Sequence, residues 1–459
     1  MFAGGEATDE QWAAFDSPLR RPLVLTDTAR STLLGLVQSV CDVIAPSRGS
    51  LSRSRQDIAY YDTERDKLIT EVAEFAGAVA ALQADPVISA VYGPDNAHRL
   101  AIQFVYNTCG LLDRGADIPA AFEATWTALV VETSQLDWRF AGVANLNNFS
   151  YDGDIADLGH GVSIQGRSFE RLKQTLNWDQ VDLDRLTEDW SAGYGASSYV
   201  LVVVTTQPKG PANFVLASDG AAYPLAARAL LAMRLHGAGG LHLGRMLLNR
   251  PAAFNVGVGG RSSTGWTIWR PGIQYKLTDT MIPDIRQQVD TLTTVENHLQ
   301  TSARHIGLAL RSFSSIYDRL MHQGEDCVID SITALEALWK LDSELSFRLA
   351  FRTSSLLGRT DDSREKIFET LRTYYKIRNK IVHGSTLSKN ESALVLNDEP
   401  LREIVRTTLR AFIHLLANPG EWTVQRLASD PDPILLHSER RSALQKAMAL
   451  LPGGDDDSK

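Results

Sequence analysis

Apolar side chains recur every three to four residues along much of the chain, a period that predicts amphipathic helices. Ahead of residue 136, this period predicts helices at Thr28–Ile44, Gln56–Leu82, Asn96–Leu112 and Pro119–Thr133. Residues 1–26 combine Gly, Pro and charged residues with weak periodicity, so we expect a loose lead-in there. Residues 27–135 are therefore predicted to form a helical region.

The pattern changes after residue 136, where Asn and Gly become frequent and β-branched runs begin. Strands are predicted at Val162–Ile164, Tyr199–Thr206 and Trp266–Trp269. Between them, the helical period is found at Phe169–Leu176, Leu183–Trp190 and Leu225–Leu235. We expect residues 136–275 to form a mixed α/β accessory region.

Helical periodicity returns after Pro271-Gly272, and no further strand is expected. Helices are predicted at Ile282–Leu299, His305–Leu320, Asp326–Leu341, Leu345–Leu357, Ser363–Val382 and Pro400–Leu416. Residues 280–420 should thus form a helical bundle, followed over residues 421–459 by a short helix and an acidic tail. The predicted fold class is α+β and mostly helical.

The formal net charge of the chain is −9, which argues against a surface covered by cations that bind nucleic acid. Residues 364–389 are an exception, because seven Lys and Arg residues there accompany only two acids, Glu365 and Glu369. Any contact with phosphate is expected at this basic segment. The alternative interpretation is an ordinary solvated helix face.

The basic segment includes most of the predicted helix Ser363–Val382, and its apolar positions share one face: Leu371, Tyr374, Tyr375 and Ile381. Three cations spaced four residues apart form a cationic stripe on another face: Arg372, Lys376 and Lys380. Gly384 is the residue type expected at a left-handed C-cap. His383 would then lie in the last turn of the helix, near Arg378.

An Arg and a His five positions apart also occur by chance, so the surrounding segments have to support any assignment. Here the motif reads Arg378-Asn379-Lys380-Ile381-Val382-His383, and upstream of it lie Glu325-Asp326, Ile332–Trp339 and Leu345–Arg352. In this order, these segments resemble the Apea-like branch of the HEPN superfamily (higher eukaryote and prokaryote nucleotide-binding), whose members carry Arg-x4-6-His. The resemblance covers roughly residues 300–417.

This resemblance implies a HEPN-like helical bundle and a metal-independent endoribonuclease, in a prokaryotic antiviral defence or toxin–antitoxin setting. His383 would be the acid or base, Arg378 the phosphate clamp, and Asn379 a residue that orients either of them. Imidazole exchanges protons near neutral pH, and guanidinium offers phosphate a planar fork of donors. RNA is the expected partner, with the cationic stripe as its further contact, and a homodimer through the bundle is expected because HEPN ribonucleases usually form their site across one.

Glu336 interrupts an otherwise apolar helix face between Leu335 and Trp339. An unpaired buried carboxylate is costly, so this side chain either points outward or pairs with a cation. In a HEPN-like bundle, Glu336 would face the motif helix and hold Arg378 or another Arg in place.

Other candidate sites are weaker. The Gly-rich run at residues 256–261 lacks the Lys-Ser/Thr of a phosphate-binding loop, and His236 and His242 have no acid or thiol partner at ligand spacing, so we expect a loop with solvent-facing imidazoles. No metal or cofactor is expected. The longest apolar run, Tyr199–Val204, is too short to span a bilayer, and the first residues lack a leader pattern, which predicts a soluble cytoplasmic protein.

Two alternatives to the enzyme remain: a non-catalytic nucleotide- or RNA-binding module with a regulatory or dimerisation role, and a purely structural protein. The accessory region has no catalytic constellation of its own, which favours a sensing or restraining role for it. A regulatory ligand or an antitoxin would then be a further partner. The alternative is that the region only enlarges the core or positions substrate.

Overall fold

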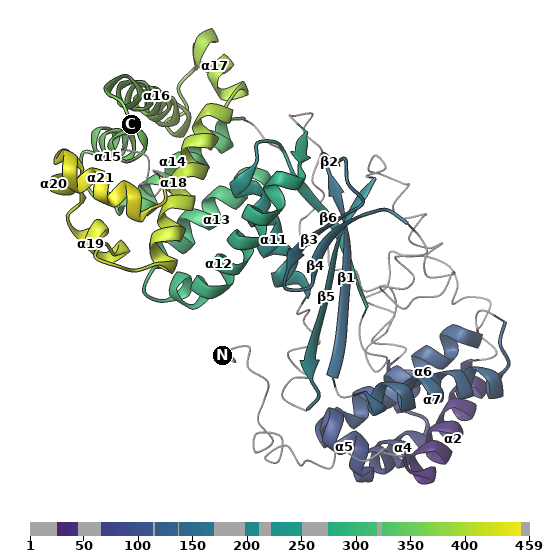
Figure 1. Ribbon diagram of the computed structural model, residues 1–459. Coiled ribbons are helices and arrows are strands. Elements are labelled where there is room, and N and C mark those ends of the chain that lie inside the picture. Colours follow the sequence, from purple (N-terminus) through teal and green to yellow (C-terminus); the bar gives the residue numbers. More distant parts are fainter. Residues whose placement is uncertain are drawn as a thin grey trace.

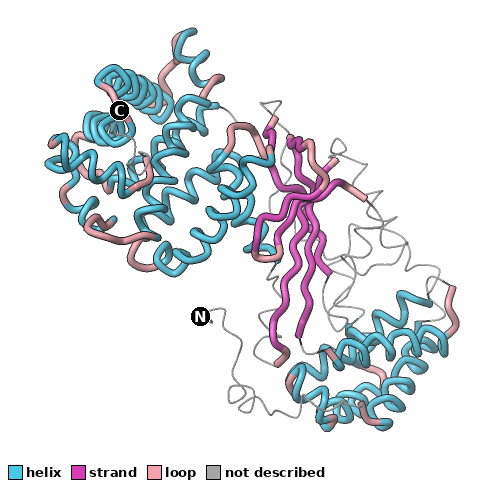
Figure 2. Tube along the Cα trace, viewed as in Figure 1, coloured by secondary structure: helices cyan, strands magenta, loops and turns pink. Residues whose placement is uncertain are grey.

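The structure is a computed structural model, and it describes residues 25–44, 66–112, 115–135, 137–168, 198–210, 222–249, 274–318 and 324–450. The chain is mostly helical with a small antiparallel sheet in its middle part (Figures 1 and 2). Outside the described residues lie the predicted strand Trp266–Trp269, the predicted helices Phe169–Leu176 and Leu183–Trp190, and the Gly-rich run at residues 256–261.

The N-terminal helices form a hydrophobic cluster of their own. Their bounds are α2 Asp27–Ile44, α4 Ala73–Ala84, α5 Pro86–Tyr92, α6 Ala97–Leu112 and α7 Ile118–Ser134. The predicted helix Gln56–Leu82 is not continuous, because residues 71 and 72 interrupt it. Asp85 then ends α4 and caps α5, accepting hydrogen bonds from the backbone N–H groups of Val87 and Ile88 at 2.9 and 3.1 Å.

The middle of the chain forms a five-stranded antiparallel sheet with the order β3-β4-β5-β1-β6. The strands are β1 Asp137–Asn147, β3 Ile155–Gly159, β4 Val162–Gly166, β5 Tyr199–Pro208 and β6 His242–Asn249. The predicted strands at Val162–Ile164 and Tyr199–Thr206 are confirmed as β4 and β5. Strand β1 was not predicted, because its Asn residues and Gly142 resemble turn residues.

A second, two-stranded sheet pairs β2 Phe149–Tyr151 in parallel with β7 Tyr275–Leu277. Strand β7 lies beyond Pro271-Gly272, so the expectation that strands end there is wrong. Only the pairing with β2, about 125 residues away in the chain, gives this three-residue segment its strand conformation, and no local pattern reports such a partner.

The C-terminal part is helical, and its helices are α12 Ile282–Gln300, α13 Arg304–Asp318, α14 Gly324–Trp339, α15 Leu345–Leu357, α16 Asp361–Val382, α17 Lys389–Leu396, α18 Glu399–Ala417, α19 Val424–Ser429, α20 Pro431–Leu436 and α21 Ser438–Ala447. The six predicted helices are confirmed to within a few residues as α12 to α16 and α18. Helix α17 was not predicted.

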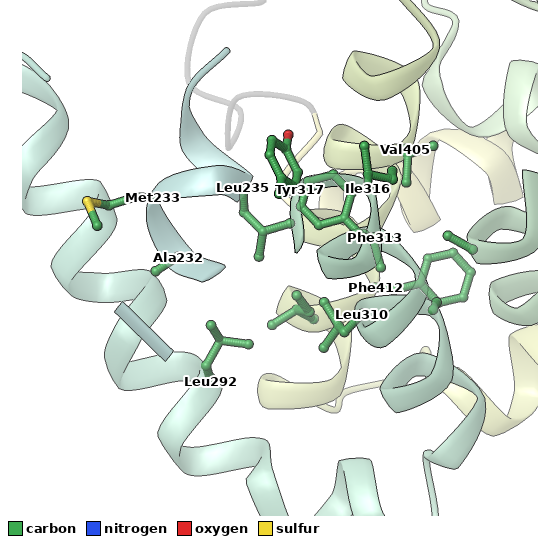
Figure 3. Packing of buried hydrophobic residues seen from close by; sticks show 14 of the residues in the cluster. Ala232, Met233, Leu235, Leu292, Leu310, Phe313, Ile316, Tyr317, Val405 and Phe412 are labelled. Atoms are coloured by element: carbon green, nitrogen blue, oxygen red, sulfur yellow. The ribbon is translucent and has the colours of Figure 1, made fainter. Parts of the chain in front are cut away.

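One continuous hydrophobic cluster includes both the five-stranded sheet and the C-terminal helices. Helix α11, Ala222–His236, lies between them and contributes Met233 and Leu235 to the same core as Leu292, Phe313 and Phe412 of the later helices (Figure 3). Any movement of the sheet against the helices would therefore disturb close-packed side chains.

Buried arginines add a polar link across this core. Arg406 of α18 is 1% exposed, and its Nε donates to the carbonyl of Arg234 at 2.9 Å. Its Nη2 donates to Glu399 at 3.0 Å, and its Nη1 donates to Glu403. Arg234, in turn, donates to Asp318 at 2.8 Å. The last turn of α11 is thus tied to both α13 and α18.

Two histidines in these helices predict how stability depends on pH. Burial, and then the charge of Lys340, lower the pKa of His305 to about 4, and its Nε2 has no hydrogen-bond partner among the described residues. Burial, and then the charge of Arg410, lower the pKa of His236. Because the unfolded chain binds these protons more readily, stability should be full above about pH 6.5 and decrease as the pH falls toward 4.

Urea unfolding at pH 7.0 and 4.5 measures this loss, and His305→Gln, which cannot titrate, is the informative variant. We expect the loss between the two pH values to be smaller in His305→Gln than in the parent by on the order of 1 kcal/mol. His298→Gln, at an exposed position of α12, serves as the control and should leave the loss unchanged. Equal losses in the parent and His305→Gln would contradict the prediction.

Candidate functional site

The motif lies at the C-terminal end of α16, whose ends are both fixed by local hydrogen bonds. Thr360 and Ser363 form a capping box at its start. At its end, the N–H of Gly384 donates to Ile381 and the N–H of Ser385 to Lys380, at 3.0 and 2.8 Å. Gly384 has φ of 67°, which confirms the predicted left-handed cap.

His383 occupies the C-cap position of α16 and is exposed. Its imidazole makes no hydrogen bond to any residue that the structure describes, and the helix carbonyls nearby are satisfied by the backbone N–H groups of Gly384 and Ser385. Capping by the imidazole is therefore not its role in this structure. The ring is available to an incoming group.

Arg378 is half-buried beside the motif, with a side chain that is 24% exposed. Its Nη1 donates to the Oδ1 of Asn379 at 3.2 Å, and its guanidinium lies 5.9 Å from the centre of the Tyr375 ring. Its Nε is buried without a hydrogen-bond partner among the described residues. Part of the donor capacity of this guanidinium is thus unused.

Glu336 of α14 faces the motif helix, as expected for a supporting carboxylate. Its Oε2 lies 3.9 Å from Nη2 of Arg378, and its Oε1 accepts a hydrogen bond of 2.7 Å from the Tyr375 hydroxyl. Burial, and then this hydrogen bond, raise the pKa of Tyr375 to about 12, so the phenol stays protonated and donates at neutral pH. The sequence pattern indicates only a core position for Tyr375, and its place three residues before Arg378 is the signal that could have indicated a role in the site.

Helix geometry separates the two principal residues. Positions five apart differ by about 140° around a helix axis and by about 7.5 Å along it, so Arg378 and His383 project to different sides. Asn379 precedes His383 by four residues and shares its face. In one copy of the chain, Asn379 and His383 therefore lie on the same face of α16, and Arg378 lies on another.

The three cations of the stripe differ in their surroundings. Lys380 donates to both carboxylate oxygens of Glu391 in α17, at 2.8 and 2.9 Å, and this hydrogen bond, followed by those from Ser388, lowers the pKa of Glu391 to about 2. Arg372 lies over the Phe368 ring, 5.8 Å from its centre. Lys376 is exposed and has no ion pair among the described residues. Lys376 and Arg372 are therefore more available to a ligand than Lys380.

The partner of Lys380, which is Glu391, was also not predicted from the sequence. Ser388 and Glu391 form the capping box that starts α17, and Ser-x-x-Glu is a pattern that can be recognised in a sequence. Glu391 reaches Lys380 only because α17 packs beside α16. The Tyr374 hydroxyl of α16 holds the two helices together, donating to the carbonyls of Leu394 and Asn397 at 3.3 and 3.2 Å.

The expectation for the two other histidines is wrong. His236 is the last residue of α11 and is half-buried, while His242 begins β6 and is 7% exposed. The groups that face His236 come from α12 and α18, and His242 is buried as part of β6. A loop-like Gly-rich sequence does not indicate either environment. In the part of the chain that the structure describes, no group of three or more His, Cys, Asp or Glu side chains is placed to hold a metal ion.

Comparisons of the chain with protein-family models, with curated proteins and with solved structures give no match. Among the described helices, no single one has the length and hydropathy needed to cross a membrane, although α4 and α5 pass that test as a pair bent by 81°. The case for a function therefore depends on the geometry of the motif and its surroundings.

Proposed function

We propose that the chain is a metal-independent endoribonuclease of the HEPN type, with His383 as acid or base and Arg378 as phosphate clamp. The observation that carries this proposal is the state of His383. Its imidazole is exposed, shares a helix face with Asn379 and has no hydrogen bond among the described residues, while the backbone alone caps the helix. A purely structural histidine would be expected to pack or to hydrogen-bond.

The chemistry follows from these groups. His383 removes the proton of a 2′-hydroxyl, whose oxygen attacks the adjacent phosphorus while the bond from phosphorus to the 5′-oxygen breaks. Arg378 stabilises the negative charge that develops on the phosphoryl oxygens. Asn379 orients the guanidinium through the hydrogen bond at 3.2 Å. The products are a 2′,3′-cyclic phosphate and a 5′-hydroxyl, and the leaving 5′-oxygen needs an acid.

A second copy of the chain would supply that acid. One imidazole cannot be base and acid on opposite sides of the phosphorus at once, and Arg378 and His383 project to different sides of α16. We therefore propose a homodimer through the C-terminal helices. Three exposed apolar side chains support this contact, at the end of α16 and on α17: Val382, Leu394 and Leu396, which are 51%, 37% and 74% exposed.

The position of Glu336 supports a second candidate, a non-catalytic module that binds RNA or a nucleotide. Its carboxylate lies 3.9 Å from Arg378 and reduces the positive charge available to a phosphate. The distance exceeds that of a hydrogen bond, so Arg378 keeps donors for a ligand. Such a module would bind RNA through the same residues and leave it uncut.

The setting that we propose is prokaryotic defence or a toxin–antitoxin pair, in which an RNA-cutting module has to be restrained. The regions ahead of the C-terminal helices are the proposed sensor, and a regulatory ligand or an antitoxin would be their partner. The shared core supports this proposal. Because the sheet, α11 and the C-terminal helices pack in one hydrophobic cluster, a conformational change in the sheet can shift the conformational equilibrium of the helices.

The deciding experiment incubates the purified full-length protein with RNA in the presence of EDTA and maps the ends. We expect cleavage to persist in EDTA and to leave 2′,3′-cyclic phosphates, because no step uses a metal. Sedimentation of the same sample should show a dimer at micromolar concentration. Uncut RNA that co-sediments with the protein would favour the binding module, and cleavage abolished by EDTA would refute the proposed mechanism.

A further inference from the structure

Three phenylalanines and an arginine form a platform on the surface of α15 and α16. The rings of Phe347 and Phe351 are stacked, with centres 6.1 Å apart and an interplanar angle of 3°. Phe347 also meets Phe368 of α16 edge to face at 5.9 Å, and Arg372 lies over the Phe368 ring. Figure 1 shows α15 and α16 side by side in the C-terminal helices.

The exposure of this platform is unusual. Phe347 is 53% exposed and is the only exposed Phe, Tyr or Trp among the side chains that the structure describes. Phe351 and Phe368 below it are half-buried against the core. A rigid ring, held by two others and left open to solvent, costs free energy in water and offers an aromatic face to a ligand.

The platform is continuous with the candidate site. Positions 368, 372, 379 and 383 lie within a narrow arc of α16, because steps of four, seven and four residues return to nearly the same face. A rise of 1.5 Å per residue places Phe368 about 22 Å from His383. Arg372 and the exposed Lys376 lie between them. An aromatic platform, two cations and the motif thus follow one another along the same side of a helix.

The charges around the platform give this path a direction. Residues 361–369, at the start of α16, hold four acids against two cations, Arg364 and Lys366. Glu365 and Glu369 among these acids are exposed, so this end of the helix would repel phosphate. On α15, Arg348 pairs with Glu344 at 3.3 Å and with Asp342 at 3.7 Å, so those acids are partly neutralised. A polyanion on the platform would therefore extend toward Lys376 and the motif.

We propose that Phe347 stacks with an unpaired base of single-stranded RNA whose backbone then follows Arg372 and Lys376 to His383. This inference rests on the proposed function and specifies its substrate class. Bases of a duplex are stacked inside it and cannot reach Phe347, whereas a splayed single strand presents the face of every base to an aromatic ring. Stacking of this kind tolerates any base and sets a distance between the anchored base and the cut.

The test measures binding apart from cleavage, by fluorescence anisotropy of labelled 12-nucleotide oligouridylate and oligoadenylate on full-length His383→Ala. Adding Phe347→Ala should weaken binding of both oligonucleotides about tenfold, the size of effect expected for losing one base stack. Phe347→Trp should retain the affinity. Leu436→Ala, at an apolar position of α20 that is 68% exposed, is the matched control and should leave the affinity for both oligonucleotides unchanged. A hairpin duplex of the same length should bind more weakly than either single strand.

Thermal melting should show only a small loss in Phe347→Ala, because the residue is already 53% exposed and only its packing on Phe351 and Phe368 is removed. If the double variant His383→Ala, Phe347→Ala binds the oligonucleotides as tightly as its His383→Ala parent, the proposed stacking on Phe347 is overturned. A loss of dimer with unchanged RNA affinity would also overturn it and would assign the ring to an interface between copies. If binding is tight and depends on Phe347 but the cleavage assay leaves the RNA uncut, the proposed stacking on Phe347 stands and only the proposed ribonuclease activity is refuted.

Discussion

His383→Ala is expected to lower RNA cleavage at least 100-fold, the size of effect typical of losing a positioned acid or base. The imidazole is exposed and has no hydrogen bond among the described residues, so its removal should leave the melting temperature unchanged. Initial cleavage rates and thermal melting of the same preparations measure both quantities. The loss should appear in the rate of the chemical step, with RNA affinity nearly retained.

Arg378→Ala should lower cleavage by a similar factor, because a charge-stabilising donor contributes about 100-fold or more. His437→Ala is the matched control for His383→Ala, since His437 is also an exposed histidine at a helix end, the start of α21. Undiminished cleavage by His383→Ala, or an equal loss in His437→Ala, would refute the assignment.

Arg406→Met should destabilise the folded chain by about 3–5 kcal/mol, the cost of breaking a buried ion pair on one side. The substitution leaves Glu399 with one cation fewer and the carbonyl of Arg234 without its hydrogen bond of 2.9 Å. The methionine side chain fills most of the volume, so the loss reports on polar groups more than on a cavity. Urea unfolding followed by circular dichroism gives the free energy.

Arg311→Met is the control for Arg406→Met, because Arg311 is exposed on α13. Its effect should stay within about 0.5 kcal/mol. If Arg406→Met also destabilises the chain by less than about 1 kcal/mol, the buried arginines do not hold α11 against α18. The coupling between the sheet and the motif-bearing helices would then rest on apolar packing alone.

Local signals in the sequence were sufficient for most helices and for the end of the motif helix. The period of apolar residues placed Leu345–Leu357 with the same bounds as α15. Gly384 was recognised as a left-handed cap because only glycine adopts positive φ there without strain. Both properties depend on residues within a few positions of each other, so the sequence by itself determined them.

Tertiary structure alone decided most of the contacts between polar groups. Strand β1 exists because β5 and β6 flank it, and its Asn residues gave no periodic signal. Lys380 is engaged because α17 brings Glu391 to it, and Tyr375 bridges to Glu336 from a different helix. The platform at Phe347 needs Phe368, 21 positions later in the chain. Pairings of this kind join residues far apart in the chain, and hydrophobic periodicity and cap residues, which are local, contain no information about them.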